Sequence, residues 1–117
     1  MARASKPNDF VVPVEGVGQF TFAKREMRDE IAIQVEFARL IDGVEPTAWL
    51  QAVCGWMSAL RVLTVRAPEG WDLDALDPFD EDTYARLGRV YQSLIEKEHS
   101  FRRGKNSDGE GNGKSEG

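Results

Sequence analysis

The chain has 117 residues, which is enough for one modest domain with a single core and too few for two. Hydrophobic residues make up 41% of it and charged residues 30%, as in an ordinary globular protein rather than a disordered one. The net charge of −5 gives no broad basic surface, so we expect no nucleic-acid partner. The N-terminal charges are not followed by an apolar stretch, so no secretory signal is predicted.

The N-terminal part predicts a flexible arm followed by a β-hairpin. Residues 1–9 are polar and offer nothing to bury, whereas residues 10–23 alternate in the manner of two short strands. Pro13 lacks the amide hydrogen that a strand ladder needs, so the first strand belongs at an edge. Phe20 and Phe22 share one face of the second strand. Because a lone hairpin is barely stable in water, both rings must pack on a helix or on another subunit.

Residues 25–42 predict the first helix, which ends where Gly43 suits a left-handed conformation. Apolar side chains cover more than half of its circumference, which is more than one neighbour requires. One cluster and its extension comprise Met27, Ile31, Val35, Ala38 and Ile41, then Ile33, Phe37 and Leu40. Either this helix lies across the middle of the domain, or part of its apolar face meets a partner. The small size of the domain favours the first alternative.

Residues 46–66 predict the central core helix, because Arg61 is the only charge between Pro46 and Val65. A helix that is apolar on most sides is expected to be buried on most sides. A line of small side chains would let a neighbouring helix approach closely: Ala48, Ala52, Gly55 and Ala59. The run is long enough for a membrane span, but its polar residues disfavour insertion, so we expect no membrane partner.

The segment 71–82 is acidic and could either bind a divalent metal or form turns. An EF-hand loop starting at Asp72 would need Gly and Glu where Asp77 and Thr83 stand. We therefore expect the aspartates to cap turns and a helix start. Four apolar side chains are expected to pin the segment to the core: Trp71, Leu73, Leu76 and Phe79.

Residues 81–101 predict a third helix with ordinary amphipathic spacing. Residues 104–117 contain five glycines and no apolar residue, so we expect a disordered tail. The predicted fold class is therefore mainly α, with three principal helices (25–42, 46–66 and 81–101), a short hairpin (10–23) and disordered ends. Residues 10–103 form the single predicted domain.

The sequence carries no catalytic, cofactor-binding or metal-binding pattern that we can identify. The single histidine, His99, and the single cysteine, Cys54, cannot form a ligand cluster, and we expect Cys54 to be a small buried residue. Phosphate-binding loops, dinucleotide fingerprints and nucleophile elbows are absent from the sequence. We expect a binding or assembly protein rather than an enzyme. The alternative is an enzyme that uses the acidic segment with a divalent metal.

Five short segments set the order of turns and helix starts between residues 10 and 104: Gly18–Phe22, Arg28–Ile31, Gly43–Pro46, Ala67–Leu73 and Ser100–Gly104. In this order the chain resembles a tail assembly chaperone of a long-tailed bacteriophage or of a prophage. The resemblance implies a small helical protein of the host cytoplasm that binds the tape-measure protein and keeps it soluble. It also implies contact with the tail tube protein, and departure before the tail is finished. Self-association is left open.

Two non-enzymatic alternatives remain. One is a structural minor tail or head–tail joining protein that stays in the particle, and the other is a helical interaction module unrelated to phages. The candidate contact residues are Phe20, Phe22, Phe37 and Trp71, of which we expect at least half to be core.

The resemblance also implies that a longer form of the protein could be made by programmed frameshifting. Gly104-Lys105 and Gly113-Lys114 could each be encoded by a slippery heptamer. Intact-mass analysis of the products of the native gene should then detect a minor species that shares residues 1–104 or 1–113. A single 117-residue product would count against frameshifting and would leave the chaperone hypothesis standing.

Overall fold

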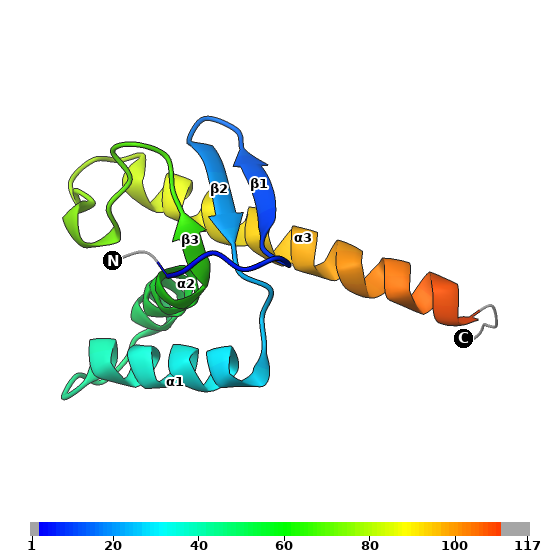
Figure 1. Cartoon of the computed structure of the whole chain (residues 1–117). Coiled ribbons are helices and arrows are strands. Elements are labelled where there is room, and N and C mark those ends of the chain that lie inside the picture. Colours follow the sequence, from blue (N-terminus) through cyan, green and yellow to red (C-terminus); the bar gives the residue numbers. More distant parts are fainter. Residues whose placement is uncertain (1–2, 111–117) are drawn as a thin grey trace.

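A computed structural model describes residues 3–110 of the chain, with side chains up to Arg102. Its elements are β1 (Phe10–Val14), β2 (Gly18–Phe22), α1 (Met27–Ile41), α2 (Ala48–Leu63), β3 (Thr64–Arg66), the short 3₁₀ helix η1 (Leu73–Ala75) and α3 (Thr83–Glu110). Figure 1 shows α1 along one edge, α3 across the other side and α2 between them, with the strands against α3. The predicted mainly helical fold with an N-terminal hairpin is confirmed.

The hairpin forms where the alternation predicts it. β1 pairs antiparallel with β2, with Phe10 opposite Phe22, and the strand order β1-β2-β3 leaves Pro13 on an edge strand. The turn is closed by the amide of Val17, which donates to the carbonyl of Val14 at 3.0 Å. Gly16 in this turn has a φ of 81°, a conformation that glycine adopts without strain.

The predicted helix 46–66 is wrong at its C-terminal end. α2 stops at Leu63, and Thr64–Arg66 is a third strand that pairs antiparallel with β2. The amide of Ala23 also donates to the carbonyl of Leu63 at 2.8 Å. Without β3, the outer edge of β2 would lack backbone partners. A short β-branched run at the end of an apolar helix is compatible with either structure, and the neighbouring strand decides the outcome.

The hairpin phenylalanines pack inside the same chain, on α2 and α3. Phe20 and Phe22 are both 0% exposed, and their rings stack with centroids 5.6 Å apart. Phe20 also meets the edge of Trp71 at 5.3 Å. The rest of the fully buried core comes mainly from the two long helices: Leu60, Leu63, Leu87, Val90 and Leu94. The aromatic face of β2 is therefore part of the hydrophobic core of this chain.

Gly18 allows the chain beyond β3 to lie directly against the hairpin. A Cβ atom at this position would be 2.6 Å from Cγ of Pro68, and the φ of Gly18 is +142°. We expect Gly18→Ala to lower the free energy of unfolding by about 2 kcal/mol or more, because both the clash and the backbone strain oppose a side chain. Urea denaturation measures this loss.

Gly70→Ala is the matched control for the Gly18 prediction. Gly70 also has a positive φ, of +89°, but a Cβ there would meet nothing within 4 Å. This variant should lose only the backbone contribution, about 1 kcal/mol. Equal losses in the two variants would contradict a role for the contact with Pro68.

The preferred position of the first helix, across the middle of the domain, is wrong. α1 lies at the edge of the molecule and packs on α2. Its wide apolar arc is split, because Ile33 is buried at 6% exposure while Met27, Ile31 and Val35 are 74%, 61% and 64% exposed. α2 is also less covered than predicted, since Trp49 at its start is 55% exposed.

The N-terminal arm is tied to the body of the molecule, and α3 is longer than predicted. In the arm predicted to be flexible, Nη1 of Arg3 donates to Oδ1 of Asp29 at 3.1 Å and to the carbonyl of Val62 at 3.0 Å. α3 continues past its predicted end to Glu110, so it includes the start of the predicted tail, and residues 111–117 lie outside the described part. Phe101 meets the ring of Phe10 edge-on at 5.0 Å.

None of the helices within residues 3–110 combines the length and the apolar content needed to cross a membrane.

Candidate functional site

The candidate site is a groove of about 380 Å³ between α1, α2 and α3. We call it the helical groove. It is lined by Ile33, Gln34 and Phe37 of α1, by Gln51, Ala52, Gly55, Trp56 and Ala59 of α2, by Tyr91 of α3, and by Arg25 and Glu30 at one end. The lining combines apolar and aromatic side chains with a few polar groups, as in grooves that accept side chains of a partner.

The line of small residues on α2 keeps the groove open. Ala52, Gly55 and Ala59 all line it, so the surface that was expected to bring a helix close also leaves a hollow beside that helix. Gly55 is the clearest case, because a Cβ built there would meet nothing within 4 Å. Glycine inside a helix costs about 0.5–1 kcal/mol relative to alanine. This position therefore gives up helix stability and leaves space in the groove.

Aromatic side chains form the walls. Phe37 lines the groove from α1 and is partly exposed. Trp56 and Tyr91 lie with ring centroids 6.4 Å apart, which joins α2 to α3 at the other wall. Large rings at the border of an open hollow can bury additional apolar surface against a partner.

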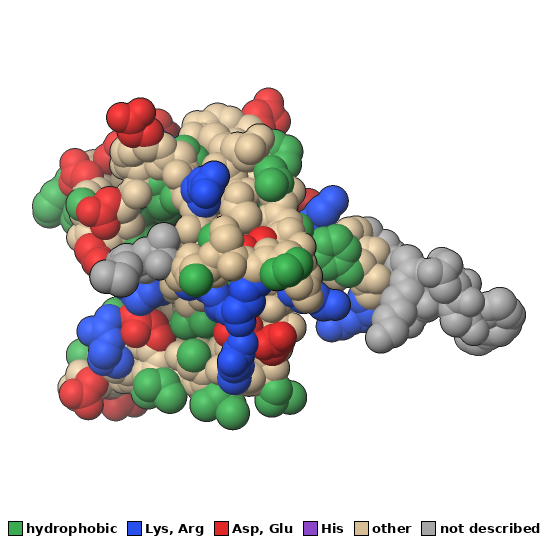
Figure 2. All heavy atoms as spheres, viewed as in Figure 1, with side chains coloured by type: hydrophobic (Ala, Val, Ile, Leu, Met, Phe, Trp, Pro, Cys, Tyr) green, Lys and Arg blue, Asp and Glu red, His purple; other side chains and the backbone are tan. Residues whose placement is uncertain are grey.

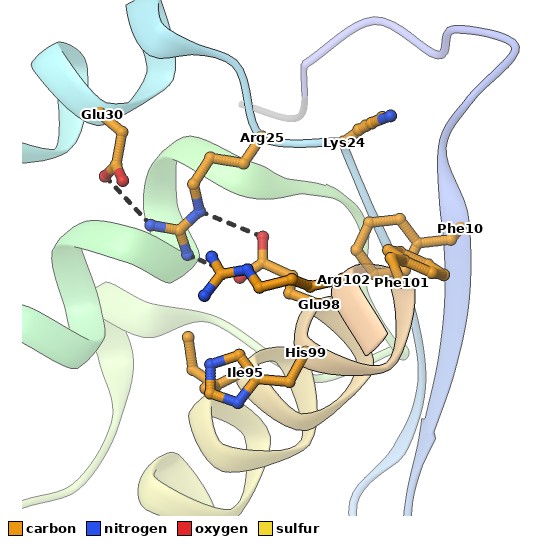
Figure 3. Close-up of a pocket in the computed structure, with 9 residues that line it drawn as sticks. All are labelled: Phe10, Lys24, Arg25, Glu30, Ile95, Glu98, His99, Phe101 and Arg102. Atoms are coloured by element: carbon orange, nitrogen blue, oxygen red, sulfur yellow. Dashed lines mark hydrogen bonds and ion pairs between the residues drawn. The ribbon is translucent and has the colours of Figure 1, made fainter. Parts of the chain in front are cut away.

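A partly buried ion-pair cluster, drawn in Figure 3, lies at one end of the groove. The guanidinium of Arg25 donates two hydrogen bonds to the carboxylate of Glu98 on α3, one of 3.1 Å to Oε2 and one of 2.9 Å to Oε1. Its Nη1 also donates to Oε1 of Glu30 on α1 at 3.1 Å. Burial alone would lower the pKa of Arg25, but the two carboxylates outweigh it and raise that pKa. Arg25 is therefore a fixed cation that links α1 to α3.

Figure 3 shows the side chains that line a second hollow, of about 530 Å³, which also borders Arg25. Arg25 and Glu30 line both hollows, so their ion pair forms a shared wall. The second hollow carries further charged side chains, since Lys24, Glu98 and Arg102 also line it.

A second charged network holds α1 against α2. Oε2 of Glu36 lies 2.6 Å from Nη2 of Arg39 and 2.9 Å from Nε of Arg61, and Arg61 also binds Asp74 in η1. The hydrogen bond from Arg39 is the main cause that lowers the pKa of Glu36. These contacts fix the position of the α1 wall of the groove.

We expect the free energy of unfolding to fall in acid because of Glu36 and Asp29. Burial raises the pKa of Asp29, but the amide of Glu26 and the guanidinium of Arg3 outweigh burial, so its pKa is also lowered. A carboxylate whose pKa is lower in the folded state stabilises the fold above its unfolded pKa, and this stability is lost as the pH falls through the folded value. The loss should therefore begin near pH 4 to 5, roughly where unfolded carboxyl groups titrate, and increase below it.

Thermal unfolding between about pH 6 and pH 2.5 measures this dependence. Glu36→Gln should be less stable than the parent at neutral pH and should lose less on acidification. Glu45→Gln, at an exposed position, is the control and should follow the parent curve. Parallel curves for the parent and Glu36→Gln would contradict the assignment.

Of the four contact candidates predicted from the sequence, the structure places Phe37 in the helical groove. Trp71 is half-buried against Phe20 and borders a different hollow, next to Arg61. Phe20 and Phe22 are core residues with no exposed surface, which agrees with the expectation that at least half would be core. Sequence reasoning did not name Trp56 and Tyr91 as groove residues, because no local pattern brings them together. The line of small residues was the one available signal.

The acidic segment forms turns, as predicted. Oδ1 of Asp72, Asp77 and Asp80 each accepts a hydrogen bond from the amide two residues later, at 2.9–3.0 Å. Trp71, Leu73 and Leu76 pack on the core, but the prediction that Phe79 does so is wrong, since Phe79 is 94% exposed. No three His, Cys, Asp or Glu side chains within the described residues gather closely enough to hold a metal ion.

No protein-family model, no curated protein and no solved structure matches the chain, so the functional argument rests on the helical groove and on the sequence.

Proposed function

We propose that the protein is a non-catalytic tail assembly chaperone of a long-tailed phage or prophage, and that it binds an apolar helical segment of the tape-measure protein in the helical groove. The observation that carries the proposal is the open groove itself, with its small floor at Gly55 and its aromatic walls. The resemblance of residues 10–104 to such chaperones supplies the identity of the partner.

The groove suits one recurring mode of recognition, in which an amphipathic helix inserts apolar side chains into a hydrophobic groove. Phe37, Trp56 and Tyr91 provide apolar contact area, and Gln34 and Gln51 provide amides that can bind the polar edge of a partner helix. The ion-pair cluster at Arg25 holds the walls in place before binding, which lowers the ordering cost of association.

On this proposal the protein acts in the host cytoplasm, keeps the tape-measure protein soluble and brings it to the tail tube protein. The tape-measure protein is a long chain, and the resemblance implies that its hydrophobic segments need to be covered before the tail forms. The net charge of −5 on the small chaperone would limit aggregation of the complex.

Co-expression with the tape-measure protein encoded in the same genome tests the proposal. The expected result is that the tape-measure protein becomes soluble and co-purifies with this chain, and that mass spectrometry of finished particles does not detect the chain. Presence in particles at a fixed stoichiometry would instead support a structural tail or head–tail joining protein. A tape-measure protein that stays insoluble and unbound would contradict the chaperone proposal and favour a helical module with another partner.

A further inference from the structure

The outer face of α1 is a stripe of exposed apolar side chains that the helical groove does not use. Met27, Ile31 and Val35 follow each other at four-residue spacing and are 74%, 61% and 64% exposed, and Ala38 next to them is also exposed. Such spacing places these side chains on one face of a helix. Figure 2 shows hydrophobic side chains along the edge of the molecule that α1 forms in Figure 1. We call this face the outer stripe.

The outer stripe tapers along α1. Its N-terminal half carries the long side chains Met27 and Ile31, its middle carries Val35, and its C-terminal half carries the small Ala38. A second α1 that runs in the opposite direction would place large side chains opposite small ones. A parallel copy would place large opposite large at one end and leave a gap at the other. Close packing at natural density therefore favours the antiparallel arrangement.

The charges at the border of the stripe favour the same arrangement. Arg28 in the first turn and Asp42 at the C-cap are both exposed, and 100° steps place them about 20° to either side of Val35. Both are seven positions from Val35. A two-fold axis at Val35 therefore brings Arg28 near Asp42 of the second copy, twice by symmetry. Within its own chain, Arg28 forms an ion pair with Glu26 at 3.0 Å. Because this pair is exposed, it competes only weakly with the pair between Arg28 and Asp42 of the second copy.

We infer that the isolated protein forms an antiparallel dimer in which the outer stripes of two α1 helices cover each other about a two-fold axis at Val35. Antiparallel helix dipoles add to the fit. One helix pair buries less than a standard interface of about 1,600 Å², so the dimer is weak and depends on concentration. This inference does not rest on the proposed function, because the helical groove opens on another side of α1.

Single cysteines in the full-length chain test the arrangement under mild oxidation. Val35→Cys should form a disulfide-linked dimer, because the two side chains meet at the axis. Met27→Cys should not, because its two copies would lie about 24 Å apart along the helix direction. The parent chain is the control, since its Cys54 is buried. Cross-linking of Met27→Cys, or of neither variant, would overturn the inference.

A charge swap gives a second test by analytical ultracentrifugation over roughly 10–500 µM, the range expected for a small interface. Arg28→Glu and Asp42→Arg should each weaken dimerisation about tenfold, because each change disrupts both symmetric pairs. The double variant should restore it, and circular dichroism should show unchanged helix content in all three. A monomer at every concentration, or a double variant as weak as the single ones, would overturn the inference.

Discussion

Phe20→Ala should lower the free energy of unfolding by about 3–5 kcal/mol, because a fully buried ring is removed and a cavity remains. Phe20 is 0% exposed, stacks on Phe22 and meets Trp71 edge-on, so little can collapse into the space. Small domains are stable by only about 5–15 kcal/mol, so the variant should be close to unfolding at room temperature.

Urea denaturation followed by tryptophan fluorescence measures this loss, since Trp71 reports directly on the neighbourhood of Phe20. Phe79→Ala is the matched control, because it removes the same ring from a side chain that is 94% exposed. The control should change the stability by less than about 0.5 kcal/mol. Similar losses in both variants would contradict the assignment of Phe20 to the core and of Phe79 to the surface.

On the proposed function, Gly55→Leu should strongly weaken capture of the tape-measure protein while leaving the protein itself folded. A Cβ at Gly55 meets nothing within 4 Å, so the leucine side chain can extend into the helical groove without a clash. Leucine is also a better helix residue than glycine by about 0.5–1 kcal/mol, so the thermal midpoint should stay or rise. We expect at least a tenfold loss of affinity, since the partner would lose the space for about one apolar side chain.

Gly55→Ala separates groove filling from helix stabilisation. It should raise the thermal midpoint, because alanine also favours the helix more than glycine does. Since it adds only one methyl group to the groove, it should retain most of the binding. Co-purification with tagged partner, compared with the thermal midpoint of each variant, measures both effects. Full binding by a folded Gly55→Leu protein would show that the partner does not use the groove.

Local patterns in the sequence were sufficient to predict the hairpin and the three helices. The alternation around Phe20 and Phe22, the glycine at position 43 and the apolar spacing of residues 81–101 each act over a few neighbours. Gly43 indeed has a φ of 77° after α1. These elements are where local preference and tertiary packing agree.

Tertiary packing determined what the sequence did not predict. Thr64–Arg66 became a strand because β2 offers it backbone partners, and α1 moved to the edge because only its Ile33 side is covered. The helical groove also results from tertiary packing. Gly55 was visible in the line of small residues, but Tyr91 and the clamp of Arg25 on Glu98 come from segments far apart in the chain.

The central claim is that a partner helix occupies the helical groove. The most direct test is a two-dimensional ¹H–¹⁵N NMR titration of the protein with apolar helical peptides from the tape-measure protein. The account predicts saturable shifts of the amides of Phe37 and Gly55 and of the indole NH of Trp56, with the indole signal of Trp49 unchanged. Saturable shifts confined to the hairpin or to the acidic segment 71–82, with the groove signals unmoved, would contradict it.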